Sequence, residues 1–186
     1  MEEKMEETQK ANNETENEIE ETIDIATDLE EIIKKVQENG KSLETLPQEY
    51  QDNKEVVMEA LKQDGEALEF ASDRLKDDKE VVMLAISKAA WTAYYASERL
   101  KADKEVIMAS VQTYGQTLYY ASEELRDDDE VVKAAISNKG LIIKYASFRL
   151  RDNKELAEIA VKQNKEAYHF LSQRLKDDEE IKSLLN

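Results

Sequence analysis

The sequence predicts an all-α, solenoid-like array of short antiparallel helix pairs, and two observations carry this prediction. The first is a unit of 25 residues that returns without insertions, starting at Leu75, Leu100, Leu125, Leu150 and Leu175. A fixed period of this size is typical of a solenoid, in which each unit buries its apolar face only against its neighbours. The second is the presence of only four glycines and one proline in 186 residues, which suits helices joined by simple turns.

The charge and apolar patterns divide the chain into two parts. Residues 1–18 are expected to be a disordered acidic tail, since residues 1–24 hold ten acidic side chains and two lysines, a net charge of −8. From Ile19 a helical spacing of apolar residues leads into a single repeat domain over 19–186, which ends in a capping helix over 178–186. Its units start near residues 25, 50, 75, 100, 125 and 150. The alternative is that the segment from Ile19 binds a partner as an amphipathic helix.

The first helix of each regular unit is expected to begin after an aspartate, at Asp52, Asp77, Asp127, Asp152 and Asp177. Each of these is followed three residues later by a glutamate, which is the spacing of a capping box and places negative charge at the positive end of the helix dipole. In the unit that starts at Leu100, Ala102 replaces the aspartate. There we expect Asp103 to cap the helix one residue later.

The second helix of each unit is predicted to span about nine residues. It follows a glycine that is expected to end the first helix in the left-handed conformation, at Gly40, Gly65, Gly115 and Gly140. An aromatic column on this helix is predicted to form part of a second buried face, at Phe70, Tyr95, Tyr120, Tyr145 and Phe170. The two helices together would bury one apolar face against each neighbouring unit.

The first unit departs from the pattern, as expected of a terminal repeat. Thr27 and Glu30 have the spacing of a capping box. Pro47 stands where the later units have serine, inside the predicted second helix. Because proline lacks an amide donor, it is expected to shorten or kink that helix.

The units have the form Leu-x-Asp-Asp-Lys-Glu-Val-Val-x-x-Ala-Ile-x-x-x-Gly-x-x-Leu-x-Tyr-Ala-Ser-x-Arg, and Leu75 to Arg99 and Leu125 to Arg149 fit it best. This pattern resembles the helical repeats of the domain-of-unknown-function family numbered 4116, over about residues 28–186. The resemblance implies a helical array with no established activity, so it assigns no functional residues. The chain departs from the pattern at Pro47, at Ala89 and Ala90, and at Lys165.

Composition excludes several classes of function. The formal net charge of −17 disfavours nucleic acids and anionic membranes, because affinity for both is built from lysine and arginine. The chain has no cysteine, no apolar run long enough to span a membrane, and an acidic start unlike a secretory signal. We therefore expect a cytoplasmic, reducing location, and the residues call for no cofactor.

Two polar columns have simple structural explanations. Glutamates recur every 25 residues from Glu30 to Glu180, and arginines lie at Arg74, Arg99, Arg149 and Arg174; helix capping and solvent-screened pairing explain them better than a ligand site. A serine column lies at Ser72, Ser97, Ser122, Ser147 and Ser172. The first four have no histidine nearby in the sequence, which argues against nucleophilic catalysis. No catalytic residue is predicted, and the chain is not expected to be an enzyme.

Two further candidates are also better explained as structure. The run from Asp127 to Glu130 is dense in carboxylates, but it lacks the alternating ligands and the glycine of a calcium loop. His169 occupies a column that also holds Glu69, Tyr94, Tyr119 and Lys144, which indicates an exposed position. No metal site is predicted.

The candidate site is a set of apolar residues at positions where the terminal units are polar. Three outer columns of the second helix read Glu66, Glu69, Asp73 in the first regular unit and Glu166, His169, Gln173 in the last. The middle units instead supply a predicted protein-binding patch made of Trp91, Tyr94, Tyr119, Leu141 and Phe148. Exposed patches of this kind mark interaction surfaces, in which tryptophan and tyrosine are common anchors.

The function expected from the sequence is therefore a non-enzymatic scaffold that binds a protein or peptide at this patch. An acidic rim around the patch would favour a basic partner. Two alternatives stay open: Trp91 and Leu141 pack inside as core, or the chain is a structural protein that assembles with copies of itself. The sequence does not identify the partner or the oligomeric state.

Overall fold

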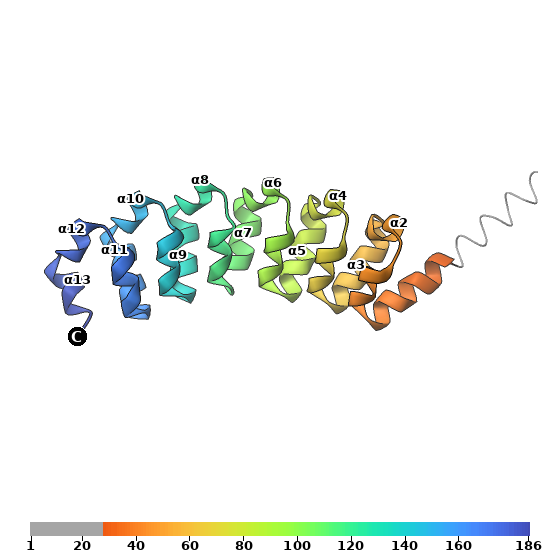
Figure 1. Cartoon of the computed structure of the whole chain (residues 1–186), viewed down its shortest axis with the longest axis horizontal. Helices are drawn as coiled ribbons and strands as arrows, with labels where there is room; N and C mark the ends of the chain where they lie inside the picture. Colours follow the sequence, from red (N-terminus) through yellow and green to blue (C-terminus); the bar gives the residue numbers. More distant parts are fainter. Residues whose placement is uncertain (1–27) are drawn as a thin grey trace, which may run out of the picture.

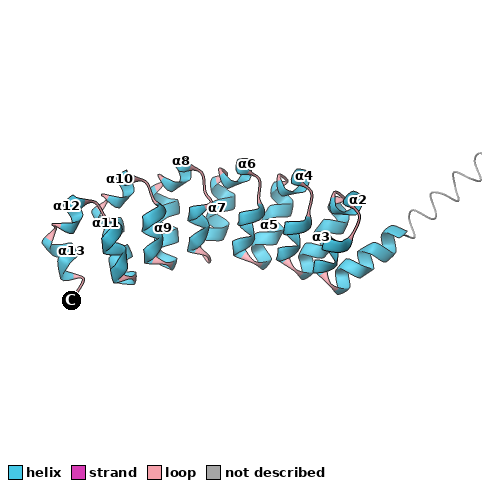
Figure 2. Cartoon of the chain, viewed as in Figure 1, coloured by secondary structure: helices cyan, strands magenta, loops and turns pink. Residues whose placement is uncertain are grey.

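The computed structural model describes residues 28–186, which form one elongated row of helices (Figure 1). Every regular element in this range is helical (Figure 2), which confirms the predicted all-α, solenoid-like array. The expected tail over 1–18, the expected domain start at residue 19 and the expected cap at Thr27 lie outside the described residues.

Each regular unit begins with a long α-helix, and successive long helices pack against one another. They are preceded by a helix over residues 28–38. The long helices are α3 (Lys54–Gln63), α5 (Lys79–Lys88), α7 (Lys104–Val111), α9 (Asp129–Asn138) and α11 (Lys154–Gln163).

The caps of these helices lie one residue later than predicted. Asn53 caps α3, since its side-chain oxygen accepts hydrogen bonds from the amides of Glu55 and Val56 at 3.0 and 3.3 Å. The predicted cap Asp52 is instead the C-cap of the preceding short helix, which ends at Gln51. The same correction applies to the other four aspartates named above. The Asp103 cap of α7 is confirmed.

The second half of each unit is not one helix of about nine residues. It is a 3₁₀-helix followed, after a short break that is Ala–Ser in four units, Leu46–Pro47 in the first and Leu171–Ser172 in the last, by an α-helix of four residues. The 3₁₀-helices are η1 (Gly40–Thr45), η2 (Gly65–Phe70), η3 (Ala90–Tyr95), η4 (Gly115–Tyr119), η5 (Gly140–Tyr145) and η6 (Lys165–Phe170). The short α-helices are α2 (Gln48–Gln51), α4 (Asp73–Lys76), α6 (Glu98–Lys101), α8 (Glu123–Arg126), α10 (Phe148–Arg151) and α12 (Gln173–Lys176), and α13 (Glu179–Ser183) follows them.

Serine causes this break in the second helix. Ser72 has extended backbone angles, and its hydroxyl accepts a hydrogen bond from the Leu75 amide at 3.3 Å, which caps α4. Pro47 occupies the equivalent place before α2, with a φ of −52° and a ψ of 152°. Pro47 therefore fits a break that every unit has, and the predicted shortening or kink of a longer helix is wrong.

The glycines permit close approach between neighbouring units. No described glycine has a positive φ, so the predicted left-handed helix ends are wrong. A Cβ added to Gly65 would lie 2.6 Å from the carbonyl oxygen of Ala85 in the next long helix. Ala90 occupies this column in the next unit, and α7, the long helix that follows it, ends after eight residues instead of ten.

The core consists of aliphatic residues from the long helices and the 3₁₀-helices, such as Val56, Leu61 and Leu68. The aromatic column from Phe70 to Phe170 is half-buried in all five units, and Phe70, Tyr95, Tyr145 and Phe170 pack against the core. The column therefore lies at the edge of the predicted buried face and not inside it. The core falls into two clusters that meet within α7. Three buried polar residues gather near this division, namely Thr92, Ser110 and Thr117.

Hydrogen bonds join the short helices along one edge of the row, which is the upper edge in Figure 1. The Ser72 amide donates to the carbonyl oxygen of Gln51 at 2.9 Å, and the Ser72 hydroxyl donates to the Asp52 carboxylate. Arg74 Nε donates to the same carboxylate at 3.0 Å. This three-residue contact, here called the Asp–Ser–Arg clamp, explains the columns of aspartate, serine and arginine without catalysis.

Candidate interaction surface

Aromatic side chains of three successive 3₁₀-helices form a continuous line of rings on the outer face of the array. In a 3₁₀-helix one turn takes three residues, so side chains three positions apart, such as those of Trp91 and Tyr94, lie on the same side of the helix. The line, here called the aromatic row, consists of Trp91, Tyr94 and Tyr95 in η3, Tyr119 at the end of η4, Tyr120 directly after it, and Tyr145 in η5. Successive ring centroids lie 4.8 to 5.6 Å apart in tilted or edge-to-face geometry, which is favourable for aromatic pairs.

The structure brings four of the five predicted patch residues close to this row. Trp91, Tyr94 and Tyr119 belong to it, and Leu141 lines a pocket that Tyr119 and Tyr145 also line. Tyr94 and Tyr119 are 47% and 54% exposed, whereas Trp91 and Leu141 are half-buried. The alternative interpretation, in which Trp91 and Leu141 are core residues, is therefore wrong, because both are partly exposed.

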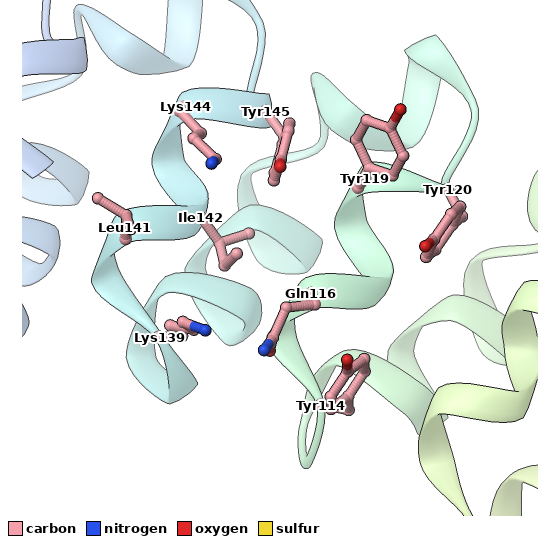
Figure 3. Close-up of a pocket in the computed structure, with 9 residues that line it drawn as sticks. All are labelled: Tyr114, Gln116, Tyr119, Tyr120, Lys139, Leu141, Ile142, Lys144 and Tyr145. Atoms are coloured by element: carbon pink, nitrogen blue, oxygen red, sulfur yellow. The ribbon is translucent and has the colours of Figure 1, made fainter.

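Phe148 lies apart from the row, at the start of α10, and is 85% exposed. It lines a second pocket of about 510 Å³ together with Tyr145, Arg126 and Arg151. The first pocket, of about 320 Å³, lies between η4 and η5. Figure 3 shows this first pocket. Lys144 and Tyr145 line both pockets, so the two are neighbours.

Charged side chains border this surface at both ends, with Glu69 beside Tyr95 and Lys101 over the Tyr94 ring at one end and mainly basic residues at the other. At the Trp91 end, the Tyr95 hydroxyl donates to Glu69 at 2.8 Å. Burial, together with this hydrogen bond, raises the pKa of Tyr95 to about 12. At the Phe148 end the charged lining residues are mainly basic, which differs from the acidic rim expected from the sequence. These residues are Lys139, Lys144, Arg126 and Arg151, with Glu123 as the carboxylate.

Two groups of surface residues were missed by reasoning from sequence. The tyrosines Tyr95, Tyr120 and Tyr145 were assigned to a buried face because they recur in every unit. Of the basic residues, Arg126 and Arg151 belong to a column that is visible in the sequence, at Lys76, Lys101, Arg126, Arg151 and Lys176. Because the chain is strongly acidic, the presence of a basic residue at this position in five successive units could have indicated a basic strip on the surface.

The polar residues considered for catalysis or metal binding are engaged in structural contacts. Asp127 accepts hydrogen bonds from Ser147 and Arg149, and Asp128 pairs with Lys104 at 2.9 Å. The His169 side chain is exposed. No group of three or more His, Cys, Asp or Glu side chains within residues 28–186 is arranged to hold a metal ion. Among these residues, no helix is long and apolar enough to cross a membrane.

Comparison with known proteins shows one family match. The family model described as "Domain of unknown function (DUF4116)" matches residues 28–76, 53–101, 78–126, 103–151 and 153–182. These matches together cover most of the chain and follow the 25-residue period. No curated protein and no solved structure matches the chain.

Proposed function

The chain belongs to the DUF4116 family, whose description names no activity, and we propose that it is a non-enzymatic scaffold that binds a protein or peptide at the aromatic row and Phe148. The observation that carries this proposal is the exposure of Phe148, at 85%, in a column where other units have Asp73, Glu98 and Glu123. Exposing a large apolar side chain to water at this position is unfavourable. Such a side chain gains free energy when a partner covers it.

The neighbouring rings extend this argument. Tyr94 and Tyr119 are about half exposed, yet each ring packs against a ring of the next unit at 4.8 Å. Such rings are held in place before a partner arrives, so binding loses little side-chain entropy. Tyrosine and tryptophan are frequent anchors of protein interfaces because they combine apolar area with a polar tip.

The rest of the molecule suits a scaffold. Asp–Ser–Arg clamps join the short helices at four of the five junctions from α2 to α12, and close contacts at the glycines join neighbouring units as well. These contacts present a long surface of defined shape. The serine and aspartate columns are occupied by these clamps, and this favours a binding role over catalysis. The absence of cysteine supports our further proposal that the scaffold works in a reducing compartment.

The test is a selection of peptides from a displayed random library against the full-length chain, followed by binding measurements on purified variants. Tyr119→Ala should weaken the selected peptides by about tenfold or more, as expected of an interface anchor. His169→Ala is the matched control, since it lies in the same column of the last complete unit and should bind as the native chain does. Equal binding by both variants would remove the aromatic row from the proposal.

Self-assembly is distinguished from this function by sedimentation velocity over a range of protein concentrations. A partner-binding scaffold is expected to sediment as the same species throughout. Association of the native chain that Tyr119→Ala abolishes would instead assign the surface to contacts between copies.

A further inference from the structure

We infer that the segment bound at the Phe148 end is acidic: a peptide that places an apolar side chain against Phe148 and a carboxylate against Arg151. This inference rests on the proposed function and gives the partner's chemistry. It is opposite in sign to the basic partner expected from the net charge of the chain.

The argument begins with a pattern of pairing within the short helices. Glu98 lies 3.0 Å from Lys101 in α6, and Glu123 lies 3.8 Å from Arg126 in α8, both three residues apart. The next unit keeps the cation, Arg151, but has Phe148 in place of the carboxylate. Phe148 therefore leaves Arg151 without the carboxylate that Lys101 and Arg126 have in the two preceding units.

Arg151 is consequently open to an external anion. Its guanidinium lies over the Phe148 ring, 4.2 Å from the centroid. Within residues 28–186 no carboxylate forms an ion pair with it, whereas Arg149, two residues earlier, pairs with Asp127 and Asp129. An arginine stacked on an aromatic ring keeps the edge of its guanidinium free for a carboxylate, which it can bind through two hydrogen bonds.

The surroundings of Arg151 strengthen the preference for an acidic segment. The 510 Å³ pocket is lined by Arg126, Lys144 and Arg151, with Glu123 as its one lining carboxylate. The Lys144 ammonium lies over the Tyr145 ring at 4.7 Å and forms no ion pair within the described range. The lining thus carries an excess of positive charge in a chain whose net charge is −17. A basic segment would meet like charges here, whereas an acidic one would meet complementary charge.

The pocket also offers the apolar contact that such a segment needs. Phe148 and the half-buried Tyr145 form its apolar part, next to the guanidinium of Arg151. An apolar side chain can therefore be covered by rings while a neighbouring carboxylate reaches the cations. A site that contacts both groups would bind an acidic peptide with an apolar side chain more tightly than a purely apolar peptide.

The selection described above tests this inference through the charge of the recovered peptides. We expect peptides that bind at the surface to contain Asp or Glu next to aliphatic or aromatic residues, and to bind more weakly as salt rises. Peptides that depend on Tyr119 but are neutral or basic would overturn the inference and leave the proposed function standing. Peptides that are insensitive to every surface variant would overturn both.

Two pairs of variants of the full chain sharpen the test. Arg151→Gln should weaken an acidic peptide by about tenfold and reduce the salt dependence of binding, because it removes the charge-assisted hydrogen bonds. Lys176→Gln, in the same column of the next short helix, is its control and should have no effect. Native affinity of Arg151→Gln would overturn the inference.

Phe148→Glu restores the carboxylate of the repeat and gives Arg151 an internal partner. It should reduce binding of the same peptide by at least about tenfold while the circular dichroism spectrum stays unchanged, since position 148 is exposed. Gln48→Glu makes the equivalent change at the start of α2, where the residue is also exposed, and serves as the control. If Phe148→Glu binds the acidic peptide as the native chain does, neither Phe148 nor Arg151 forms the site.

Discussion

Ala102 and Glu124 occupy the aspartate and arginine positions of the Asp–Ser–Arg clamp at the junction between α6 and α8. Among the five junctions from α2 to α12, this is the one where the clamp is missing. At the other four junctions an arginine Nε lies 2.9 to 3.0 Å from an aspartate oxygen, in the pairs Arg74–Asp52, Arg99–Asp77, Arg149–Asp127 and Arg174–Asp152. Both partners are replaced together at this junction, so neither charge is left alone. The division of the core within α7 lies beside it. We expect the contact between α6 and α8 to be the least stable of the row.

Restoring the clamp should therefore stabilise the chain. We predict that Ala102→Asp combined with Glu124→Arg raises the melting temperature by a few degrees, and that the double variant gains more than the sum of the two single variants. The gain is modest because the counterpart pairs are solvent-exposed and screened. Urea denaturation of the four proteins measures the coupling. Additive effects would show that the pair does not form in this setting.

Gly140 should not accept a methyl group. We predict that Gly140→Ala lowers the free energy of unfolding by about 1 to 3 kcal/mol, because its Cβ would overlap the carbonyl oxygen of Ala160. Ala90→Gly is the control in the same column and should change stability by less than about 1 kcal/mol. Chemical denaturation checks both. A Gly140→Ala variant as stable as the native chain would mean that the next helix moves away freely.

The helix caps are matched to the residue that faces them from the preceding unit. Asp78, Asp103, Asp128 and Asp178 each pair at 2.8 to 2.9 Å with a lysine, namely Lys54, Lys79, Lys104 and Lys154. Asn153 caps α11 where Asp129 replaces that lysine, and Asn53 caps α3 where Leu29 does. An uncharged cap thus occurs where no cation is available.

Two opposite changes of charge at these caps should both destabilise the chain. Asn153→Asp brings a carboxylate toward Asp129, and Asp128→Asn deprives Lys104 of a partner. We predict a lower urea midpoint for each variant, with both losses reduced in 1 M salt by screening, where the Debye length falls to about 3 Å. If net charge alone mattered, Asp128→Asn would stabilise a chain of charge −17, and that outcome would contradict the prediction.

The clamps should also make stability depend on acid pH. The Ser97 hydroxyl, and then Arg99, hold the pKa of Asp77 below its ordinary value, and Asp52, Asp127 and Asp152 are lowered chiefly by their serines in the same way. Because the pKa is lower in the folded state, this contribution is complete above the unfolded value of about 4 and is lost as pH falls through the folded pKa.

Asp77→Asn isolates this effect from other carboxylates. We expect the variant to be less stable than the native chain at pH 7, and the difference between the two to shrink below about pH 4. Urea denaturation at several pH values measures it. A difference that stays constant down to about pH 2 would show that ionised Asp77 is not what stabilises the clamp.

Much of the fold could be predicted from the repeat alone, but the division of the second helix could not. The Ala–Ser break contains no glycine or proline in the regular units, and serine is compatible with a continuous helix. Pro47 was the one visible sign of the break, since proline fits the extended backbone before α2. Because Pro47 occurs only in the first unit, it was interpreted as a local departure that would shorten or kink the second helix there.

The candidate site divides in the same way. Trp91, Tyr94, Tyr119, Leu141 and Phe148 could be found because they depart from the polar pattern of their columns. The part played by Tyr145 and Arg151 could not, since every unit has an aromatic and a basic residue at those places. Only the stacking of η4 on η5, and of α8 on α10, shows which of them line a common pocket.

The sequence by itself determined the period, the all-α class and the equivalence of residues 25 positions apart, because a constant period requires equivalent residues to have equivalent surroundings. The tertiary structure decided which charges pair and which faces are buried. The partners of the clamps and caps are 20 to 26 residues apart and meet only when one unit packs on the next. No local pattern of spacing records that contact, since it arises from the packing of the array as a whole.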